Sequence, residues 1–166
     1  MSPFAEPDLM LIRRVDPSTP ELRPLIEGNQ SHGAMATDAE SDHTFGVEDL
    51  RQPDVRFFAA YEAETPLGCG AFKALSDGSA EVKSVFVSEA ARGRGVARRV
   101  MDHLAQRAAQ EGFTALVLET GSTLCPEYDA ARVLYERLGY DYCGPFEGYT
   151  QDPLSAFMRL PLSSAT

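Results

Sequence analysis

The stretch VFVSEAARGRGVA, residues 85–97, is the most informative part of the sequence. It opens with β-branched and aromatic residues, passes through two glycines separated by one arginine, and at Val96 begins an apolar pattern with three- and four-residue spacing. The first part is typical of a strand and the last of an amphipathic helix. A glycine-rich turn at such a junction leaves the first N–H groups of the helix open to anions, above all phosphates. The stretch predicts either an ordinary turn or an anion-binding loop.

The surrounding pattern predicts further strands and helices. A three-stranded meander is expected over residues 55–62, 68–75 and 80–87, with turns at 64–68 and 76–79. The long helix should end at Gly112, and the continuous apolar run that follows is typical of a strand covered on both faces. The other expected elements are a strand at 8–15, a short helix at 20–26 capped by Thr19, helix and loop over 27–47, the apolar strand at 115–119, a helix at 129–138, and strands at 140–143 and 156–160. This order predicts an α+β fold in a single domain over residues 1–166, with its core at about 8–162.

Composition narrows the classes of partner. The 166 residues suffice for one domain, and 43% apolar with 24% charged residues is ordinary for a soluble globular protein. The net charge of −10 argues against nucleic acid and against an anionic membrane surface, because both require basic surfaces. We therefore expect neither as a partner.

The cysteines, the N-terminus and the potential metal ligands show no pattern that indicates secretion, a membrane span or a metal site. The three cysteines match neither a disulfide framework nor a Cys-x-x-Cys pair, which favours reduced thiols in a cytoplasmic protein. No signal peptide is evident at the N-terminus, and nowhere do 18 apolar residues run together. No cluster of His, Cys and Asp has metal-ligand spacing, so we expect no metal.

Three anion-binding motifs can be compared with the glycine-rich junction. The run Gly-x-x-x-x-Gly-Lys-Ser/Thr of a P-loop is absent. A dinucleotide fingerprint fails because Arg98 stands where its third glycine should be, and because the junction follows a meander. Residues 92–97, RGRGVA, match Arg/Gln-x-x-Gly-x-Gly/Ala, and residues 131–140, ARVLYERLGY, match A-x-x-x-Y-E-x-x-G-[FY]. With these segments in this order, the chain resembles the GCN5-related N-acetyltransferase family over about residues 8–162.

The resemblance implies a fold and a co-substrate. The fold is a mixed, mostly antiparallel central sheet of about seven strands flanked by helices. The co-substrate is acetyl-CoA, with its diphosphate on the backbone amides of residues 94–97 and added charge from Arg92 and Arg94. Family members often carry Asn where this chain has Tyr128. The residues implied to contact the coenzyme are Val85, Phe86, Val87, Arg92, Gly93, Arg94, Gly95, Val96, Ala97 and Tyr128.

Acetyl transfer to an amine needs a base for the amine and an acid for the departing thiolate. Glu81 matches the position of the catalytic glutamate in some family members; the alternative is an exposed carboxylate paired with Lys83. Strand alternation is expected to place Glu81, Lys83, Val85 and Val87 on one face. Tyr135 matches the family's general acid; the alternative is a half-buried core tyrosine. Free backbone groups on a splayed strand would orient the thioester carbonyl.

The acceptor side is expected in the segment around His43 and in the last strands with their loops, which wall the acceptor pocket in the family. The predicted acceptor residues are His43, Thr120, Phe146 and Tyr149, and Glu147 and Asp152 could attract an amine. For His43 the alternative is a solvated loop position, and His103 is expected to be structural.

The sequence therefore predicts an N-acetyltransferase that moves acetyl from acetyl-CoA to a primary amine of a small molecule, by direct attack in a ternary complex. The alternatives are acetylation of a peptide N-terminus or lysine, a non-catalytic acyl-CoA-binding domain, and an anion-binding domain without coenzyme A affinity. Family members are often dimers, so a homodimer is left open.

Overall fold

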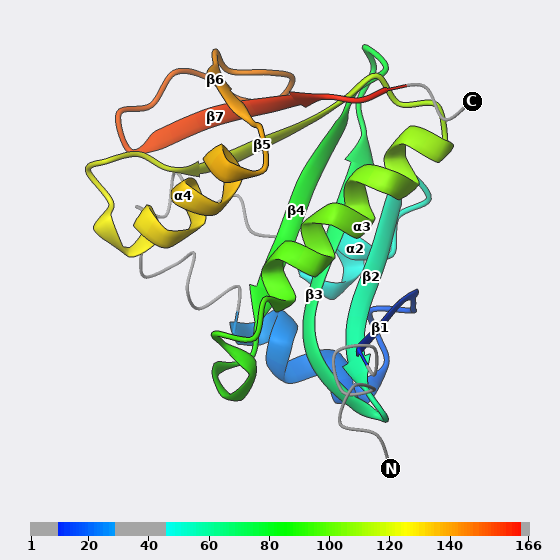
Figure 1. The fold of residues 1–166 in the computed structure, drawn as a ribbon. Helices are drawn as coiled ribbons and strands as arrows, with labels where there is room; N and C mark the ends of the chain where they lie inside the picture. Colours follow the sequence, from blue (N-terminus) through cyan, green and yellow to red (C-terminus); the bar gives the residue numbers. More distant parts are fainter. Residues whose placement is uncertain (1–9, 29–45, 164–166) are drawn as a thin grey trace.

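The computed structural model describes residues 10–28 and 46–163 of the chain. Its centre is a seven-stranded sheet with the order β1-β2-β3-β4-β5-β7-β6 (Figure 1). Only β4 and β5 pair in parallel, which confirms the predicted mixed, mostly antiparallel sheet. The strands are β1 Met10–Arg14, β2 Val55–Glu62, β3 Thr65–Ala74, β4 Ala80–Val87, β5 Ala115–Gly121, β6 Asp141–Cys143 and β7 Ser155–Pro161.

Helices cover both faces of this sheet, and each face has its own apolar cluster. The long helix α3 (Val96–Gln110) lies across β2, β3 and β4, and α4 (Asp129–Arg137) lies beside β5 (Figure 1). The cluster under α3 contains Phe58, Phe72, Leu104 and Leu118 among others. The opposite cluster joins Phe57 and its strand neighbours to a second helical layer, which consists of η2 (Pro20–Leu22), helical residues 23–28 and α2 (Val47–Leu50). Short 3-10 turns η4 (Glu89–Ala91) and η5 (Pro126–Tyr128) precede α3 and α4.

The structure confirms the meander, the long helix and the buried strand after it, and it corrects one turn. The turn predicted over residues 64–68 is only two residues long, because β2 ends at Glu62 and pairs directly with Thr65. A register shift at Ala60/Tyr61 absorbs one extra residue of β3, so Pro66 joins the ladder opposite Tyr61.

The start of the first helix is as predicted, with Thr19 at the N-cap and Pro20 in the first turn, where the missing N–H costs nothing. The Thr19 side chain makes no capping bond; its hydroxyl donates to the carbonyl of Asp16 at 2.7 Å. Most of the predicted helix-and-loop segment at 27–47 lies outside the described residues.

Candidate active site

β4 and β5 pair only briefly and then splay apart, and we call the interval between their two backbone edges the slot. Their parallel pairing covers only Ala80 with Leu116 and Glu81 with Val117. Beyond this point β5 pairs with β7 on its other side, and β4 diverges from it as far as Val87 (Figure 1). The β5-facing backbone edge of β4 therefore has no strand partner beyond Glu81 in the described part of the chain. Such an edge offers N–H and C=O groups to a bound molecule.

A bulge in β4 overturns the expected alternation of side chains. The register with β3 shifts by one residue between Cys69 and Ala71, and Ser84 adopts a φ of +58° at this point. As a result Val85 and Val87 pack into the cluster under α3. Lys83 instead lies opposite Ala71, whose side chain belongs to the cluster on the other face. Glu81 and Lys83 therefore share that other face, separate from the two valines, because one extra residue reverses the order of faces.

The glycine-rich loop ends in an open helix N-terminus. Gly93 and Gly95 have φ values of +83° and +76°, and a Cβ added at either would meet no atom within 4 Å. Gly95 is the N-cap of α3, and the N–H groups of residues 93–98 donate to no acceptor among the described residues. Open amides at the positive end of a 15-residue helix form a cradle that suits an anion.

Three polar side chains meet on the face of β4 opposite α3. The Glu81 and Lys83 side chains are buried, with 5% and 9% of each residue exposed, and Lys83 Nζ lies 3.2 Å from Glu81 Oε2. Lys83 Nζ also donates to the Tyr149 hydroxyl at 3.0 Å, and that hydroxyl donates to Glu81 Oε2. Burial, followed by the charge of Glu81, raises the pKa of Tyr149. The pairing with Lys83 was foreseen, but Glu81 is not the exposed carboxylate of that alternative.

Tyr135 lies on α4, partly buried against the cluster under α3, with its ring centroid 5.9 Å from that of Tyr140. Burial raises the pKa of Tyr135 to about 12, with a smaller contribution from Tyr128. Its hydroxyl therefore stays protonated near neutral pH, which is the form that a proton donor needs.

Comparison with known proteins shows the family to which the chain belongs. The model of the acetyltransferase (GNAT) family matches residues 22–140. The chain belongs to the GNAT family. It is 42% identical over 123 residues to the uncharacterized N-acetyltransferase YsnE of Bacillus subtilis, covering 74% of this chain and 80% of that protein. It is 38% identical over 153 residues to the IAA acetyltransferase of Azospirillum brasilense, covering 91% and 97%.

Solved structures agree with this assignment. A GCN5-related N-acetyltransferase from Kribbella flavida superposes with a TM-score of 0.70 at 25% identity, covering 95% of this chain and 100% of that one. The protein is therefore an acyltransferase, and GNAT enzymes use acetyl-CoA or another acyl-CoA. Within its described residues no cluster of His, Cys, Asp and Glu could hold a metal ion. None of the helices described is long and apolar enough to cross a membrane.

In this GNAT enzyme the two loop arginines differ in their surroundings. Arg92 lies over the ring of Phe86, 5.8 Å from its centroid. Arg94 forms an ion pair with Glu62 at 2.7 Å, so its charge is already partly balanced. The expectation that both arginines add charge to the loop therefore applies more directly to Arg92.

Tyr128, which replaces the Asn found in many GNAT members, packs on the end of β5. A Cβ added at Gly121 would lie 2.2 Å from Tyr128 Cδ2, so the ring occupies the space that a side chain at this position would take. The structure thus places Tyr128 at the end of the strand that forms one wall of the slot, and its contact with coenzyme stays a prediction.

The acceptor predictions divide into three groups. Phe146 and Tyr149 come together, with centroids 4.9 Å apart, and both contact Phe157 at 5.6 Å. Thr120 lies on β5 with the alternation of Leu116 and Leu118, toward the α3 side and away from those rings. His43 lies outside the described residues.

The other polar candidates have structural partners. Glu147 accepts hydrogen bonds from the backbone and hydroxyl of Ser76, and Asp152 accepts one from the Leu154 N–H at 2.8 Å. His103 packs edge-on against Phe58 with centroids 4.9 Å apart, as expected for a structural residue.

Sequence reasoning missed two residues of the candidate site. It treated Lys83 only as a surface partner, and it did not consider Glu119, which accepts a hydrogen bond from the Ser155 hydroxyl at 2.6 Å. Alternation places Glu119 on the face opposite Leu118, and its charge acts on the Tyr149 hydroxyl. The only signal for Glu119 was its position at the end of the predicted central strand.

Proposed function

We propose that the enzyme transfers an acetyl group from acetyl-CoA to a primary amine of a small molecule, by direct attack in a ternary complex. One observation carries this proposal: a single strand, β4, joins a buried carboxylate at the closed end of the slot to an open anion-binding loop at the other end. This arrangement suits a long donor with a diphosphate at one end and a reactive thioester at the other.

The residues around the slot fit acetyl-CoA. Its diphosphate would accept hydrogen bonds from the open amides of residues 93–98, and the glycines there leave room for close approach. Its thioester would lie along β4, where the unpaired edge beyond the bulge can donate an N–H to the carbonyl oxygen. That donor would be fixed before reaction, which stabilises the oxyanion of the tetrahedral intermediate.

Proton transfer follows from the buried side chains. The bound ammonium first loses a proton to solvent. The neutral amine nitrogen then bonds to the thioester carbon, and its surplus proton passes to the Tyr149 hydroxyl while the hydroxyl proton passes to Glu81. The carbon–sulfur bond then breaks, and Tyr135 donates its proton to the sulfur. The Lys83 ammonium forms an ion pair with the Glu81 carboxylate, and this pairing offsets the cost of burying the negative charge.

The acceptor face supports an amine attached to an apolar body. Glu81 and Glu119 supply negative charge on this face, and the rings of Phe146, Tyr149 and Phe157 supply apolar surface beside it. A protonated amine is attracted both to carboxylates and to aromatic faces.

Calorimetric titration with acetyl-CoA is the first test, followed by thiol detection with a panel of small amines and short peptides. We expect binding, and thiol release that Glu81→Gln suppresses and that the exposed-surface control Glu64→Gln leaves intact. Absence of acetyl-CoA binding would overturn the proposal. Thiol release with peptides but not with small amines would mean that the acceptor is a peptide and not a small molecule.

A further inference from the structure

The one buried residue of helix α4 is charged. Of its nine residues only Arg132 is buried, with 6% of the residue exposed. Val133 is exposed, and Tyr135 is only partly buried. Besides the packing of Tyr135 on the cluster under α3, the helix that carries the proposed proton donor is therefore anchored by a buried charged side chain, whose burial requires partners.

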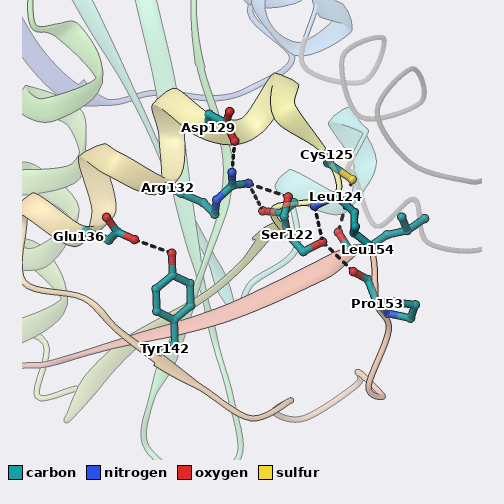
Figure 2. Close-up of polar contacts among 10 residues, drawn as sticks. Ser122, Leu124, Cys125, Asp129, Arg132, Glu136, Tyr142, Pro153 and Leu154 are labelled. Carbon is teal, nitrogen blue, oxygen red and sulfur yellow. Dashed lines mark hydrogen bonds and ion pairs between the residues drawn. The ribbon is translucent and has the colours of Figure 1, made fainter.

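The partners of Arg132 are at the end of β5. Its Nη1 donates to the carbonyls of Gly121 and Ser122, each at 2.7 Å, and its Nη2 pairs with Asp129 (Figure 2). One guanidinium thus joins the first turn of α4 to the last residues of the strand that forms one wall of the slot. Only arginine has the rigid fork of donors that serves several acceptors at once.

The carbonyls that Arg132 binds are themselves fixed. The Ser122 N–H donates to the Leu154 carbonyl at 2.9 Å, and the Ser122 hydroxyl donates to the Pro153 carbonyl at 2.6 Å (Figure 2). These bonds hold the end of β5 to the segment that enters β7. A second, exposed bond supports the next turn of α4, where the Tyr142 hydroxyl donates to Glu136 at 2.6 Å (Figure 2).

We propose that Arg132 is a positioning residue for the reaction. It lies three residues before Tyr135, so the two side chains leave the same side of the helix. By binding the β5 carbonyls, Arg132 fixes the rotation and height of α4, and this sets where the Tyr135 hydroxyl meets the coenzyme sulfur. In this role Arg132 acts through the helix and not on the substrate. The inference rests on the proposed function, because it takes Tyr135 as the proton donor.

The test compares Arg132→Met and Arg132→Lys with Arg137→Met, an exposed arginine on the same helix. Hydrogen exchange followed by mass spectrometry should show at least about tenfold faster exchange over residues 129–137 in Arg132→Met, because the buried hydrogen bonds that hold the helix are lost. Arg132→Lys should fall between, and the control should match the wild type. If Arg132→Met does not fold, Arg132→Lys provides the comparison.

A second measurement separates positioning from stability. Coenzyme A and desulfo-coenzyme A differ at the sulfur, so the ratio of their affinities reports a hydrogen bond to that atom. Tyr135→Phe should lower this ratio about fivefold, the value of a typical hydrogen bond. Arg132→Met should lower it similarly, and the double variant should lower it no further, because both changes remove the same contact. A merely structural role would change the melting temperature and leave the ratio unchanged.

The outcomes are distinct. An unchanged ratio in Arg132→Met, with a wild type whose ratio reports the sulfur contact, would overturn the role of Arg132, whatever the exchange rates. A wild type that binds both equally would remove the sulfur contact and overturn the inference with it. A wild type that binds neither compound would overturn the proposed function itself.

Discussion

Gly93→Ala tests whether the glycine-rich loop binds the diphosphate, and Gly112→Ala is its matched control. Both glycines have positive φ, +83° and +91°, and at both a Cβ would meet no atom within 4 Å. Gly93 lies before the start of α3 and Gly112 follows its end. The left-handed conformation costs a non-glycine residue about 1–2 kcal/mol. Both variants should therefore lose similar stability, which corresponds to about 2–8 °C in melting temperature.

Acetyl-CoA affinity should separate the two variants. A methyl group at Gly93 fills space through which the diphosphate would approach the open amides, and losing one charge-assisted hydrogen bond costs about 2 kcal/mol, or roughly 30-fold in Kd. The methyl group at Gly112 lies at the far end of the helix and should leave Kd unchanged. Calorimetric titration with acetyl-CoA measures the Kd of each variant, and the similar stability of the two variants makes their Kd values comparable. Equal affinities in the two variants would refute the placement of the diphosphate at this loop.

Three further predictions concern the slot and the sheet. Glu81→Gln removes the carboxylate that is ion-paired with the buried Lys83 ammonium and should lower the free energy of unfolding by about 3 kcal/mol in urea titrations; an unchanged value would mean that the pair is not buried in solution. Folding raises the pKa of Tyr135 from 10.0 to about 12. The contribution of this hydroxyl to folding stability is therefore fully present below pH 10 and is lost as the pH rises through 12. Between pH 10 and 12 the melting temperature should therefore fall less steeply with pH in Tyr135→Phe than in the wild type. Equal slopes in the two proteins would contradict the burial of Tyr135. At Gly70 a Cβ would lie 2.7 Å from a methyl group of α3, so Gly70→Ala should cost about 1–3 kcal/mol by overpacking, whereas the open Gly144→Ala should be nearly neutral in the same assay.

Local periodicity was enough to predict much of the fold. The apolar stripe from Val96 to Ala108 predicted α3, and residues 115–119 predicted a strand covered on both faces. Both patterns are dictated by which side chains face the core, and that information lies within a short window. The loop between β4 and α3 was predictable for a similar reason, because positive φ at Gly93 and Gly95 favours glycine.

The site was harder to predict, because it depends on backbone irregularity and on distant partners. Serine carries no signal for the positive φ at Ser84, yet that one residue moves Glu81 and Lys83 to the face opposite Val85. Tyr149 lies 66 residues after Lys83, and only the closure of the sheet brings the two together. Arg132 had an unremarkable place in a helix pattern, and its burial depends on carbonyls that no pattern locates.

The brief pairing of β4 with β5 forms a short joint about which the two halves of the sheet can rotate. Two residue pairs join its halves, β1 to β4 on one side and β5, β7 and β6 on the other. Gly121 lies four residues beyond the last pair, which at ~3.3 Å per residue gives an arm of ~13 Å. A rotation of ~5° about the joint then moves the mouth of the slot by ~1 Å without breaking a ladder hydrogen bond in either half. The packing around Ala80 and Leu116, where the two halves of the sheet join, therefore bears on how far β4 and β5 stand apart at their other ends.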